Sequence, residues 1–451
     1  MSDLEDRARR TMMRMAGEVR SDPELPPPVR RRARRRQAMI AGVTGVAVVA
    51  SIVGIGVGLG SVRANHATDI QTPATSLGSC APGWVVSPKP VAQGIHSDLL
   101  VAAAGTSPED VWAVGTRFRG AGASPVRAEA LFEHWDGVAW SVVPGADPGG
   151  RGAMLTGIVA LAPDDAWAVG TVAGRKAADL IEHWDGVSWS EVQAPSSTSG
   201  GIESIAASAP DDIWVKGTDY PVVGGESIDE DVYEHWDGAS WSSFVGPRAV
   251  DASLGTSTTQ VIAVGPTGEA WAGGGTVKGF GEAGQVSGAL VERWDGTSWV
   301  QMPPPQGDRP VSALAVVGAR DVWAVLGGQL RTFGGWGGGG GNVFVHWDGS
   351  GWDRSVAVDG SVMQIAARSP GDVWAVGITS QGGPLVEHWN GKGWDAVDTN
   401  APHSITDGLV AAGVTPTGSL IAFGSGYPAG LGGSSTGAVG PLSSYLWIDC
   451  R

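Results

Sequence analysis

The sequence predicts an all-β protein: a seven-bladed β-propeller closed by its N- and C-terminal strands and preceded by a single transmembrane helix. Three observations predict it. A Trp-rich sequence motif recurs six times, and a partial seventh unit is divided between the start and the end of the repeat region. A long segment without charged residues lies upstream. Repeats of about 50 residues that are rich in short strands are typical of propeller blades. The first Trp of the motif stands at Trp112, Trp167, Trp214, Trp271, Trp323 and Trp374.

One unit shows how a blade is expected to form. Residues 154–162 are an apolar run, residues 163–165 are Pro-Asp-Asp, and residues 166–171 are a short strand centred on Trp. Two further strands, 180–184 and 189–192, flank an Asp-Gly turn, which is a strong hairpin signal. The unit therefore reads as four antiparallel strands.

The repeated tryptophans are interpreted as structural. The first strands are rich in Ala, Gly and Ser, as expected where blades converge on an axis and leave room only for small side chains. Aromatic side chains then fill the wider space between neighbouring blades. Two tryptophans flank each hairpin turn and should face each other: Trp135/Trp140, Trp184/Trp189, Trp236/Trp241, Trp294/Trp299, Trp347/Trp352 and Trp389/Trp394.

The seventh unit lacks its outer strand at the C-terminal end. Residues 407–424 begin a normal blade, but the chain ends soon after Trp447, while residues 80–88 match the missing outer strand. Pairing the two ends would close the ring and bring Cys80 next to Cys450, the only two cysteines. We expect a disulfide between them, and such bonds persist in oxidising compartments. The alternative is two unrelated buried thiols.

The N-terminal region predicts a membrane anchor. Residues 38–62 carry no charge and are long enough to cross a hydrocarbon core of about 30 Å. Six arginines within residues 30–36 precede this span, so the positive-inside rule keeps the N-terminus cytoplasmic. The expected parts are a cytoplasmic basic segment (1–37), a transmembrane helix (38–62), a linker (63–79) and the propeller (80–451). A cleaved signal peptide is the alternative.

The partners expected at the N-terminus are lipid and protein. The arginines suit anionic lipid head groups, and residues 1–36 include an amphipathic pattern that could bind a cytosolic protein. Residues 80–451 hold 18 Lys and Arg against 39 Asp and Glu. A strongly acidic domain argues against binding nucleic acid and favours a cationic partner.

The repeat resembles a known group of sequences. Asp-Val-Trp-Ala-Val-Gly followed by His-Trp-Asp-Gly is similar to the Trp-rich propeller repeats of bacterial extracytoplasmic proteins, which are loosely related to kelch and galactose-oxidase central domains. The resemblance covers residues 80–451. It implies a propeller fold and an extracytoplasmic location on the cell membrane, with function carried by loops added to the fold.

A binding site is expected on one rim of the propeller. The turns between first and second strands and the Asp-Gly hairpins are nearly constant and share one rim, called here the constant rim. The other connections vary in length and share the opposite, variable rim, where repeat proteins usually bind ligands. Candidate ligand-binding residues there are Trp336, Tyr220, His96, Asp98, His403 and Asp407. The last four could hold a metal or a polar ligand, but they lack a tight spacing motif, so no metal site is assigned.

The sequence favours a non-enzymatic function without a cofactor. The repeated histidines occupy equivalent strand positions and are interpreted as structural. The one Gly-x-Ser-x-Gly match, residues 433–437, has no strand-to-helix context. We therefore expect a membrane-anchored extracytoplasmic binding or scaffold propeller that recognises a protein or glycan through its variable rim. The alternatives are a glycan hydrolase or lyase, and a transmembrane sensor that signals through its cytoplasmic segment.

Overall fold

The computed structural model describes the repeat region of the chain. The described residues are 83–88, 96–119, 127–146, 152–172, 178–194, 198–223, 226–247, 257–278, 285–307, 309–327, 342–358, 360–400, 409–415, 418–426 and 443–449. All of them belong to one compact unit, Thr75–Arg451. The expected transmembrane helix, the segments beside it and both cysteines lie outside these residues. Within the described stretches, no helix is long and apolar enough to span a membrane.

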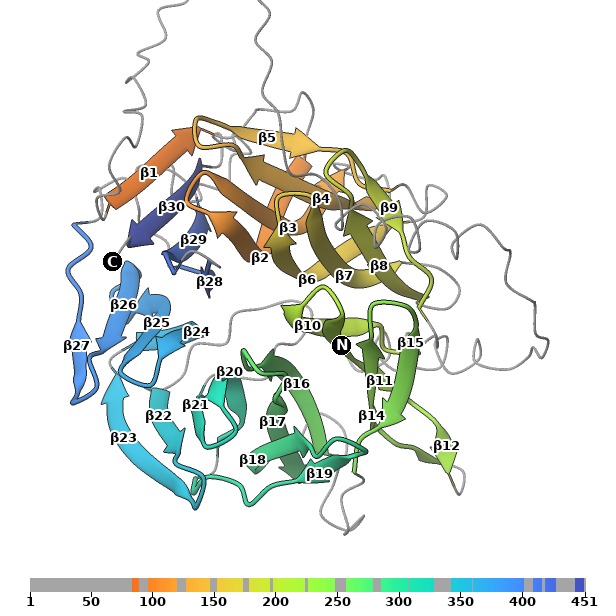
Figure 1. The fold of residues 1–451 in the computed structure, drawn as a ribbon, viewed down its shortest axis with the longest axis vertical. Helices are drawn as coiled ribbons and strands as arrows, with labels where there is room; N and C mark the ends of the chain where they lie inside the picture. The colour runs from red at the N-terminus through yellow and green to blue at the C-terminus, as the bar shows by residue number, and fades with distance from the viewer. Residues whose placement is uncertain are drawn as a thin grey trace, which may run out of the picture. The chain divides into compact units, whose positions relative to one another are not determined.

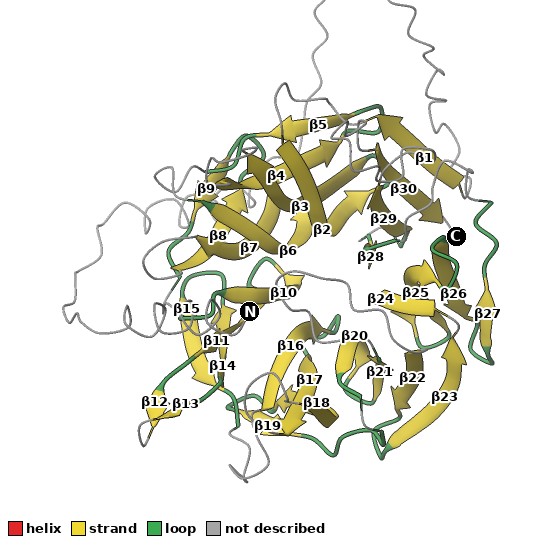
Figure 2. Ribbon diagram, turned by 180° about the vertical axis from the view of Figure 1, so that it is seen from behind, coloured by secondary structure: helices red, strands yellow, loops and turns green. Residues whose placement is uncertain are grey.

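The described residues form seven four-stranded antiparallel sheets arranged as blades around a ring (Figure 1). Every regular element among them is a strand (Figure 2). The inner strand of each blade contacts the inner strands of the blades on both sides, and blade 7 contacts blade 1. The predicted all-β, seven-bladed propeller is therefore confirmed.

The first three blades follow one another along the chain. Blade 1 consists of β2 (His96–Ser107), β3 (Asp110–Arg119), β4 (Arg127–Trp135) and β5 (Trp140–Val143). Blade 2 consists of β6 (Ala153–Ala162), β7 (Asp165–Val172), β8 (Ala178–Trp184) and β9 (Trp189–Glu191). Blade 3 consists of β10 (Ile202–Ala209), β11 (Asp212–Asp219), β14 (Glu230–Trp236) and β15 (Trp241–Val245). Blade 3 also carries a separate hairpin of β12 (Val222–Val223) and β13 (Glu226–Ser227).

The next three blades repeat the same order. Blade 4 consists of β16 (Ser257–Val264), β17 (Ala270–Lys278), β18 (Gln285–Trp294) and β19 (Trp299–Gln301). Blade 5 consists of β20 (Val311–Gly318), β21 (Asp321–Leu326), β22 (Asn342–Trp347) and β23 (Trp352–Val358). Blade 6 consists of β24 (Gly360–Ser369), β25 (Asp372–Thr379), β26 (Pro384–Trp389) and β27 (Trp394–Ala396).

Blade 7 combines strands from the two ends of the repeat region. It consists of β28 (Ala411–Val414), β29 (Leu420–Gly426), β30 (Ser443–Asp449) and β1 (Gly83–Pro88). β1 and β30 pair antiparallel, with Gly83 opposite Ile448 (Figure 1). The disulfide between Cys80 and Cys450, and the closure of the ring that it would secure, stay predictions.

The outer hairpins pair their tryptophans as expected. Trp135 stands opposite Trp140, and the same register recurs in the other five complete blades. Each pair has its ring centroids 5.6 to 6.2 Å apart. The register of each hairpin is thus set by its turn. A shift of one residue would move one tryptophan of each pair to the other face of the sheet.

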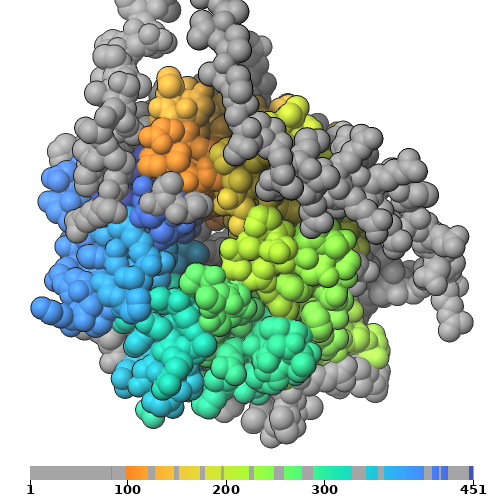
Figure 3. Space-filling view, viewed as in Figure 1, coloured from red at the N-terminus to blue at the C-terminus, as the bar shows by residue number. Residues whose placement is uncertain are grey.

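Neighbouring blades are joined by the same tryptophans. Trp112 of blade 1 lies 4.9 Å from Trp184 and 5.1 Å from Trp189 of blade 2, between ring centroids. Trp167, Trp214, Trp271 and Trp323 meet the Trp pair of the next blade in the same way. At blade 7, Trp447 lies 5.8 Å from Trp374 of blade 6, between ring centroids. Aromatic side chains thereby fill the space between successive blades. Figure 3 shows these blades in sequence order around the ring by their colours.

A β-bulge recurs in the inner strands of blades 1 to 6. In β2 it falls between Leu100 and Ala102, and the other five inner strands have a shift at the equivalent place. The glycine that ends Asp-Val-Trp-Ala-Val-Gly faces this bulge. A Cβ on Gly115 would lie 1.9 Å from the Leu99 carbonyl oxygen, and one on Gly170 would lie 2.0 Å from that of Met154. In these blades the glycine therefore leaves room for the bulged backbone, whereas blade 5 has its bulge at the equivalent place opposite Leu326.

Candidate functional site

The repeated histidines are held by hydrogen bonds and stacking. His183 Nε2 lies 2.9 Å from Asp165 Oδ1, and its ring centroid lies 4.4 Å from that of Trp167. The same Asp–His–Trp cluster occurs in blades 1, 3, 5 and 6. In blade 3 the hydrogen bonds from His235 and Ser208 outweigh burial and lower the pKa of Asp212. These histidines are thus fixed to a carboxylate and an indole in a repeated structural unit.

Blade 4 replaces both polar members of this cluster. Glu269 stands at the aspartate position, Arg293 stands at the histidine position, and the Arg293 guanidinium lies 5.9 Å from the centre of the Trp271 ring. The longer acid and the longer base are substituted together, and the Arg293 guanidinium takes the place of the imidazole beside the indole. This joint substitution supports the structural interpretation.

The constant rim is formed by nearly identical turns. Asp185 Oδ1 accepts hydrogen bonds from the backbone N–H groups of Val187 and Ser188, both at 3.0 Å. Equivalent bonds form at Asp136, Asp237, Asp295, Asp348 and Asn390. The glycine after each of these residues has a φ of 84° to 101°. Backbone hydrogen bonds hold the pKa of Asp295 at about 2.

On the same rim, the outer hairpins are hydrogen-bonded to the turns between first and second strands. Trp184 Nε1 donates to the Pro163 carbonyl at 3.1 Å, and Trp135 and Trp389 make the equivalent bond to Pro108 and Pro370. The hairpins and these turns therefore lie on one rim, as the sequence predicted. Their polar groups are used in local structure, and one blade closely resembles the next.

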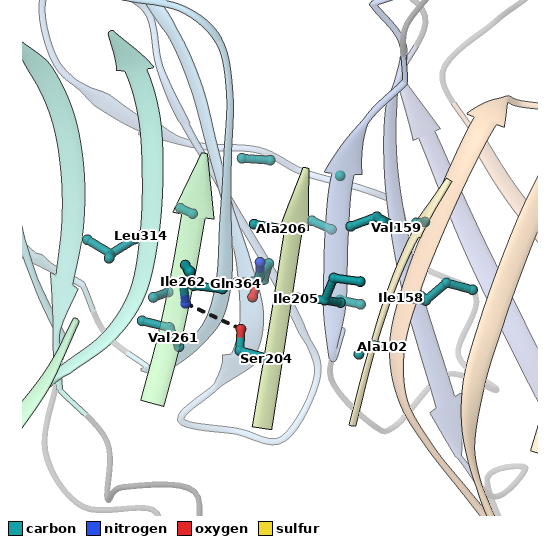
Figure 4. A pocket seen from close by; sticks show the side chains of 18 of the residues that line it. Ala102, Ile158, Val159, Ser204, Ile205, Ala206, Val261, Ile262, Leu314 and Gln364 are labelled. Atoms are coloured by element: carbon teal, nitrogen blue, oxygen red, sulfur yellow. Dashed lines mark hydrogen bonds between the residues drawn. The ribbon is translucent and has the colours of Figure 1, made fainter. Parts of the chain in front are cut away.

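The inner strands enclose a cavity of about 360 Å³ along the axis of the ring. All seven inner strands line it, mostly with Ala, Val, Ile and Leu, as expected for the convergence of the blades. Its polar lining includes Thr156, Glu203 and Gln260, which are the bulged residues of blades 2, 3 and 4. Ser204 and Gln364 also line it, and Ser204 Oγ accepts a hydrogen bond from the Ile262 backbone N–H at 3.3 Å (Figure 4).

Blade 3 contains a buried charge cluster beside this cavity. Lys216 is wholly buried, and its Nζ lies 2.7 Å from Glu203 Oε2 and 3.1 Å from Asp231 Oδ1. Nζ also donates to Thr218 Oγ1 at 2.8 Å. Burial disfavours the ammonium, but the attraction of the Asp231 and Glu203 carboxylates outweighs it, so the pKa of Lys216 is raised. The cluster therefore holds a charged lysine.

The cluster continues into blade 4 through Tyr233. The Tyr233 hydroxyl lies 2.8 Å from Glu292 Oε2, and Asp231 accepts a hydrogen bond from the Thr259 backbone N–H at 2.8 Å. Burial, reinforced by the nearby Asp231 carboxylate, raises the pKa of Glu292 to about 8. Burial thus favours the protonated form of Glu292, and Lys216 is paired with the carboxylates of Glu203 and Asp231.

Two of the six predicted ligand-binding residues have described side chains. Asp98 forms a buried bidentate ion pair with Arg117, with N–O distances of 2.9 and 2.8 Å. Tyr220 is 45% exposed, and its backbone N–H donates to Ser199 Oγ and Asp219 Oδ1. The backbone of His96 pairs with Arg119 at the start of β2. The side chain of His96, together with Trp336, His403 and Asp407, lies outside the described residues.

Sequence reasoning missed the Lys216 cluster. The signal was present, because Lys216 stands at a repeat position that holds Val114, Val169 and Val376 in other blades. A charged residue in a buried apolar column indicates a compensating partner. Within the described stretches, no group of His, Cys, Asp and Glu is arranged to hold a metal ion.

Comparison with known proteins identifies the fold. No protein-family model matches the chain and no curated protein matches it, so the resemblance to Trp-rich and kelch-like repeats stays a prediction. The structure titled YCF48 bound to D1 peptide matches with 14% identity and a TM-score of 0.49, covering 84% of this chain and 99% of that chain. A GH74 xyloglucanase from Xanthomonas campestris matches with 12% identity and a TM-score of 0.50, covering 76% of this chain.

This chain spans about half of that enzyme, 52% of its length. A mutant of the Aleuria aurantia lectin in complex with alpha-methyl-L-fucoside matches with 14% identity and a TM-score of 0.39, covering 68% of this chain and 97% of that chain. At these identities the likeness shows the propeller fold alone.

Proposed function

We propose that this protein is a membrane-anchored, extracytoplasmic binding or scaffold propeller that recognises a protein or glycan ligand through its variable rim. The contrast between the two rims carries the proposal. The Asp or Asn of each constant-rim hairpin accepts the same local backbone hydrogen bonds in six blades, and the Trp–Pro hydrogen bond recurs in blades 1, 2 and 6. A specific ligand requires a surface on which the blades differ, and the connections at the opposite rim provide it.

A non-enzymatic role is supported by the state of the reactive side chains. His134, His183, His235, His346 and His388 each lie within hydrogen-bond distance of an aspartate. Each also stacks on the tryptophan that is buried next to it. The same Asp–His–Trp arrangement thus recurs in five blades, which supports a structural role because a catalytic residue is expected at one place in the ring and not at equivalent positions of most blades.

The location outside the cytoplasm rests on the sequence of residues 1–79. Six arginines before an uncharged 25-residue run orient the span with the propeller outside. We expect a reporter fused after Arg451 to be active only outside the cytoplasm. Activity of that reporter in the cytoplasm would contradict the proposed export.

Loop replacement tests the proposed binding face. Residues 334–341 would be replaced by a short Gly-Ser link, and Trp336→Ala would be made separately, because this segment belongs to a long connection between the second and third strands of blade 5. The change in stability should be small, since loop length costs about 0.6 kcal/mol per doubling. The binding of glycans on an array, and of envelope proteins to the immobilised propeller, should fall for both variants.

Asp185→Asn is the matched control on the constant rim, because Asn390 already makes the same turn in blade 6. The control should bind like the wild type. Binding that survives both variants at residues 334–341 but is lost in Asp185→Asn, with the fold retained, would place the site on the opposite face.

A further inference from the structure

The surface of blade 3 carries charge of one sign. Residues 198–247 contain ten Asp and Glu and a single Lys, Lys216. That lysine has no exposed side chain and is paired with Glu203 and Asp231. Of the ten carboxylates, those of Asp231 and Glu234 are buried, and Asp211 and Asp237 lie on the constant rim. Burial and the nearby carboxylates of Glu203, Asp229 and Asp219 raise the pKa of Tyr220, so these three carboxylates supply the negative charge around this ring at the variable rim. No Lys or Arg side chain is exposed in the described part of the blade. Such a surface attracts cationic partners and repels anionic ones.

The same blade exposes apolar side chains at its variable-rim end. Tyr220 is 45% exposed, Val222 is 71% exposed and Val245, at the end of the outer strand, is 54% exposed. A Cβ on Gly200 would lie 3.1 Å from the Tyr220 ring, so this ring lies against the segment that leads into β10. Exposed Tyr and Val side chains gathered at one edge are a recognised feature of protein interaction sites.

The β12–β13 hairpin extends this surface away from the ring (Figure 2). β12 pairs with β13 alone, and the Ile228 backbone N–H closes the base of the hairpin on the Pro221 carbonyl at 3.1 Å. A two-stranded hairpin has edges at which an extended chain can add its own backbone hydrogen bonds. Among the described strands, those of the other blades all belong to four-stranded sheets.

We propose that Tyr220, Val222 and the β12–β13 hairpin form the docking surface for a basic, extended segment of a partner protein. Its Lys or Arg side chains would meet the carboxylates of blade 3, and its apolar side chains would pack on Tyr220 and Val222. A neutral glycan could stack on Tyr220 but would gain nothing from the uniform negative charge. The inference rests on the proposed function and deepens it, because it makes the ligand a protein and assigns it to one blade.

Peptide binding tests this surface on the full chain. The probes are three fluorescent ten-residue peptides of alternating Arg and Val, Ser and Val, or Glu and Val, measured by anisotropy at 0.15 M salt. We expect the Arg-Val peptide to bind at least tenfold more tightly than the other two. Val222→Lys should weaken its binding at least tenfold through like-charge repulsion, and Tyr220→Ala should weaken it severalfold.

Val187→Lys is the matched control, because Val187 is 83% exposed on the constant rim of blade 2. It adds the same charge, so its effect should stay below twofold. Equal weakening by Val187→Lys and Val222→Lys would show general attraction to an acidic protein and overturn the docking site. Failure of the Arg-Val peptide to bind the wild type would overturn it as well. Either failure leaves the loop replacement at residues 334–341 as a separate test of the variable rim.

Discussion

Single positions in this propeller recur from blade to blade, and blade 4 departs from the repeat at two of them. Where five blades place a histidine 2.6 to 2.9 Å from an aspartate, blade 4 has Glu269 and Arg293. The sequence predicted that the histidines are structural from their repetition. It did not reveal the aspartate partner, because the two residues lie on different strands and their register had to be known first.

A double-mutant cycle tests whether positions 269 and 293 are energetically coupled. Glu269→Asp and Arg293→His, made singly, combine one residue of the common repeat with one residue of blade 4, so each should lower the free energy of unfolding by about 1 to 2 kcal/mol. Together they restore the arrangement of the other blades. The loss in the double variant should be smaller than the sum of the single losses by about 0.5 kcal/mol or more, measured by denaturant unfolding. Additive losses would contradict the coupling.

Two buried glutamates make stability depend on pH. Burial raises the pKa of Glu182 to about 7 and that of Glu292 to about 8, against an unfolded value near 4.5. The folded state therefore binds more protons than the unfolded state between pH 4.5 and 8. The stabilisation from these protonated groups is complete below pH 4.5 and is lost as the pH rises through 7 to 8.

The melting temperature should accordingly fall between pH 5 and pH 8. Glu182→Gln and Glu292→Gln mimic the protonated side chains, so each should flatten this fall. Glu109→Gln, at an exposed position, is the control and should keep the wild-type slope. A melting temperature that rises steadily from pH 5 to pH 8 in the wild type would contradict the assignment.

At the scale of the elements, strands and hairpins could be predicted from the repeat, whereas the bulges could not. The recurring Trp motif and the Asp-Gly turns are local signals, and they predicted the blades and the Trp pairs. A bulge bends an inner strand relative to its neighbour. Its position depends on both strands, so it cannot be predicted from the sequence of one strand. The sequence feature that accompanies the bulge is the last glycine of the repeated motif, at Gly115, Gly170, Gly274 and Gly377.

Two glycine substitutions separate this explanation from general strand propensity. Gly170→Ala would place a Cβ 2.0 Å from the Met154 carbonyl oxygen, so it should destabilise the protein by about 1 to 3 kcal/mol. Gly413→Ala, in the inner strand of blade 7, meets no atom within 4 Å. It should be neutral or stabilising by about 0.4 to 1 kcal/mol, because alanine restricts the unfolded chain. Equal effects in a denaturant titration would contradict the role of the bulge.

For the whole molecule, the number of blades was predictable because each unit repeats the same aromatic positions. The candidate site was predictable only in part. Ligand binding by Asp98 stays a prediction, and the structure adds that its carboxylate forms an ion pair with Arg117. Arg117 stands opposite Asp98 on the neighbouring strand, so this ion pair could be predicted only once the strand register was known. Tyr220 is exposed as expected, whereas the Lys216 cluster beneath it depends on tertiary contacts between blades 3 and 4.

Closure of the ring can be measured through the cysteines. β1 starts at Gly83, three residues after Cys80, and β30 ends at Asp449, one residue before Cys450. We predict that non-reducing peptide mapping recovers Cys80 joined to Cys450. Cys80→Ser should destabilise the protein by about 2 to 4 kcal/mol, and a reducing agent should have the same effect on the wild type. Two free thiols in protein taken from an oxidising compartment would contradict the bond.

Site-specific photo-crosslinking in cells tests the central claim most directly, because it reports which rim meets the ligand. A benzophenone side chain would replace exposed residues on the variable rim, Leu99 and Tyr220, and exposed residues on the constant rim, Val138 and Val187. The account predicts crosslinks to a ligand from the variable-rim positions and none above background from the constant rim. Crosslinks confined to Val138 and Val187, or equal from both rims, would contradict it.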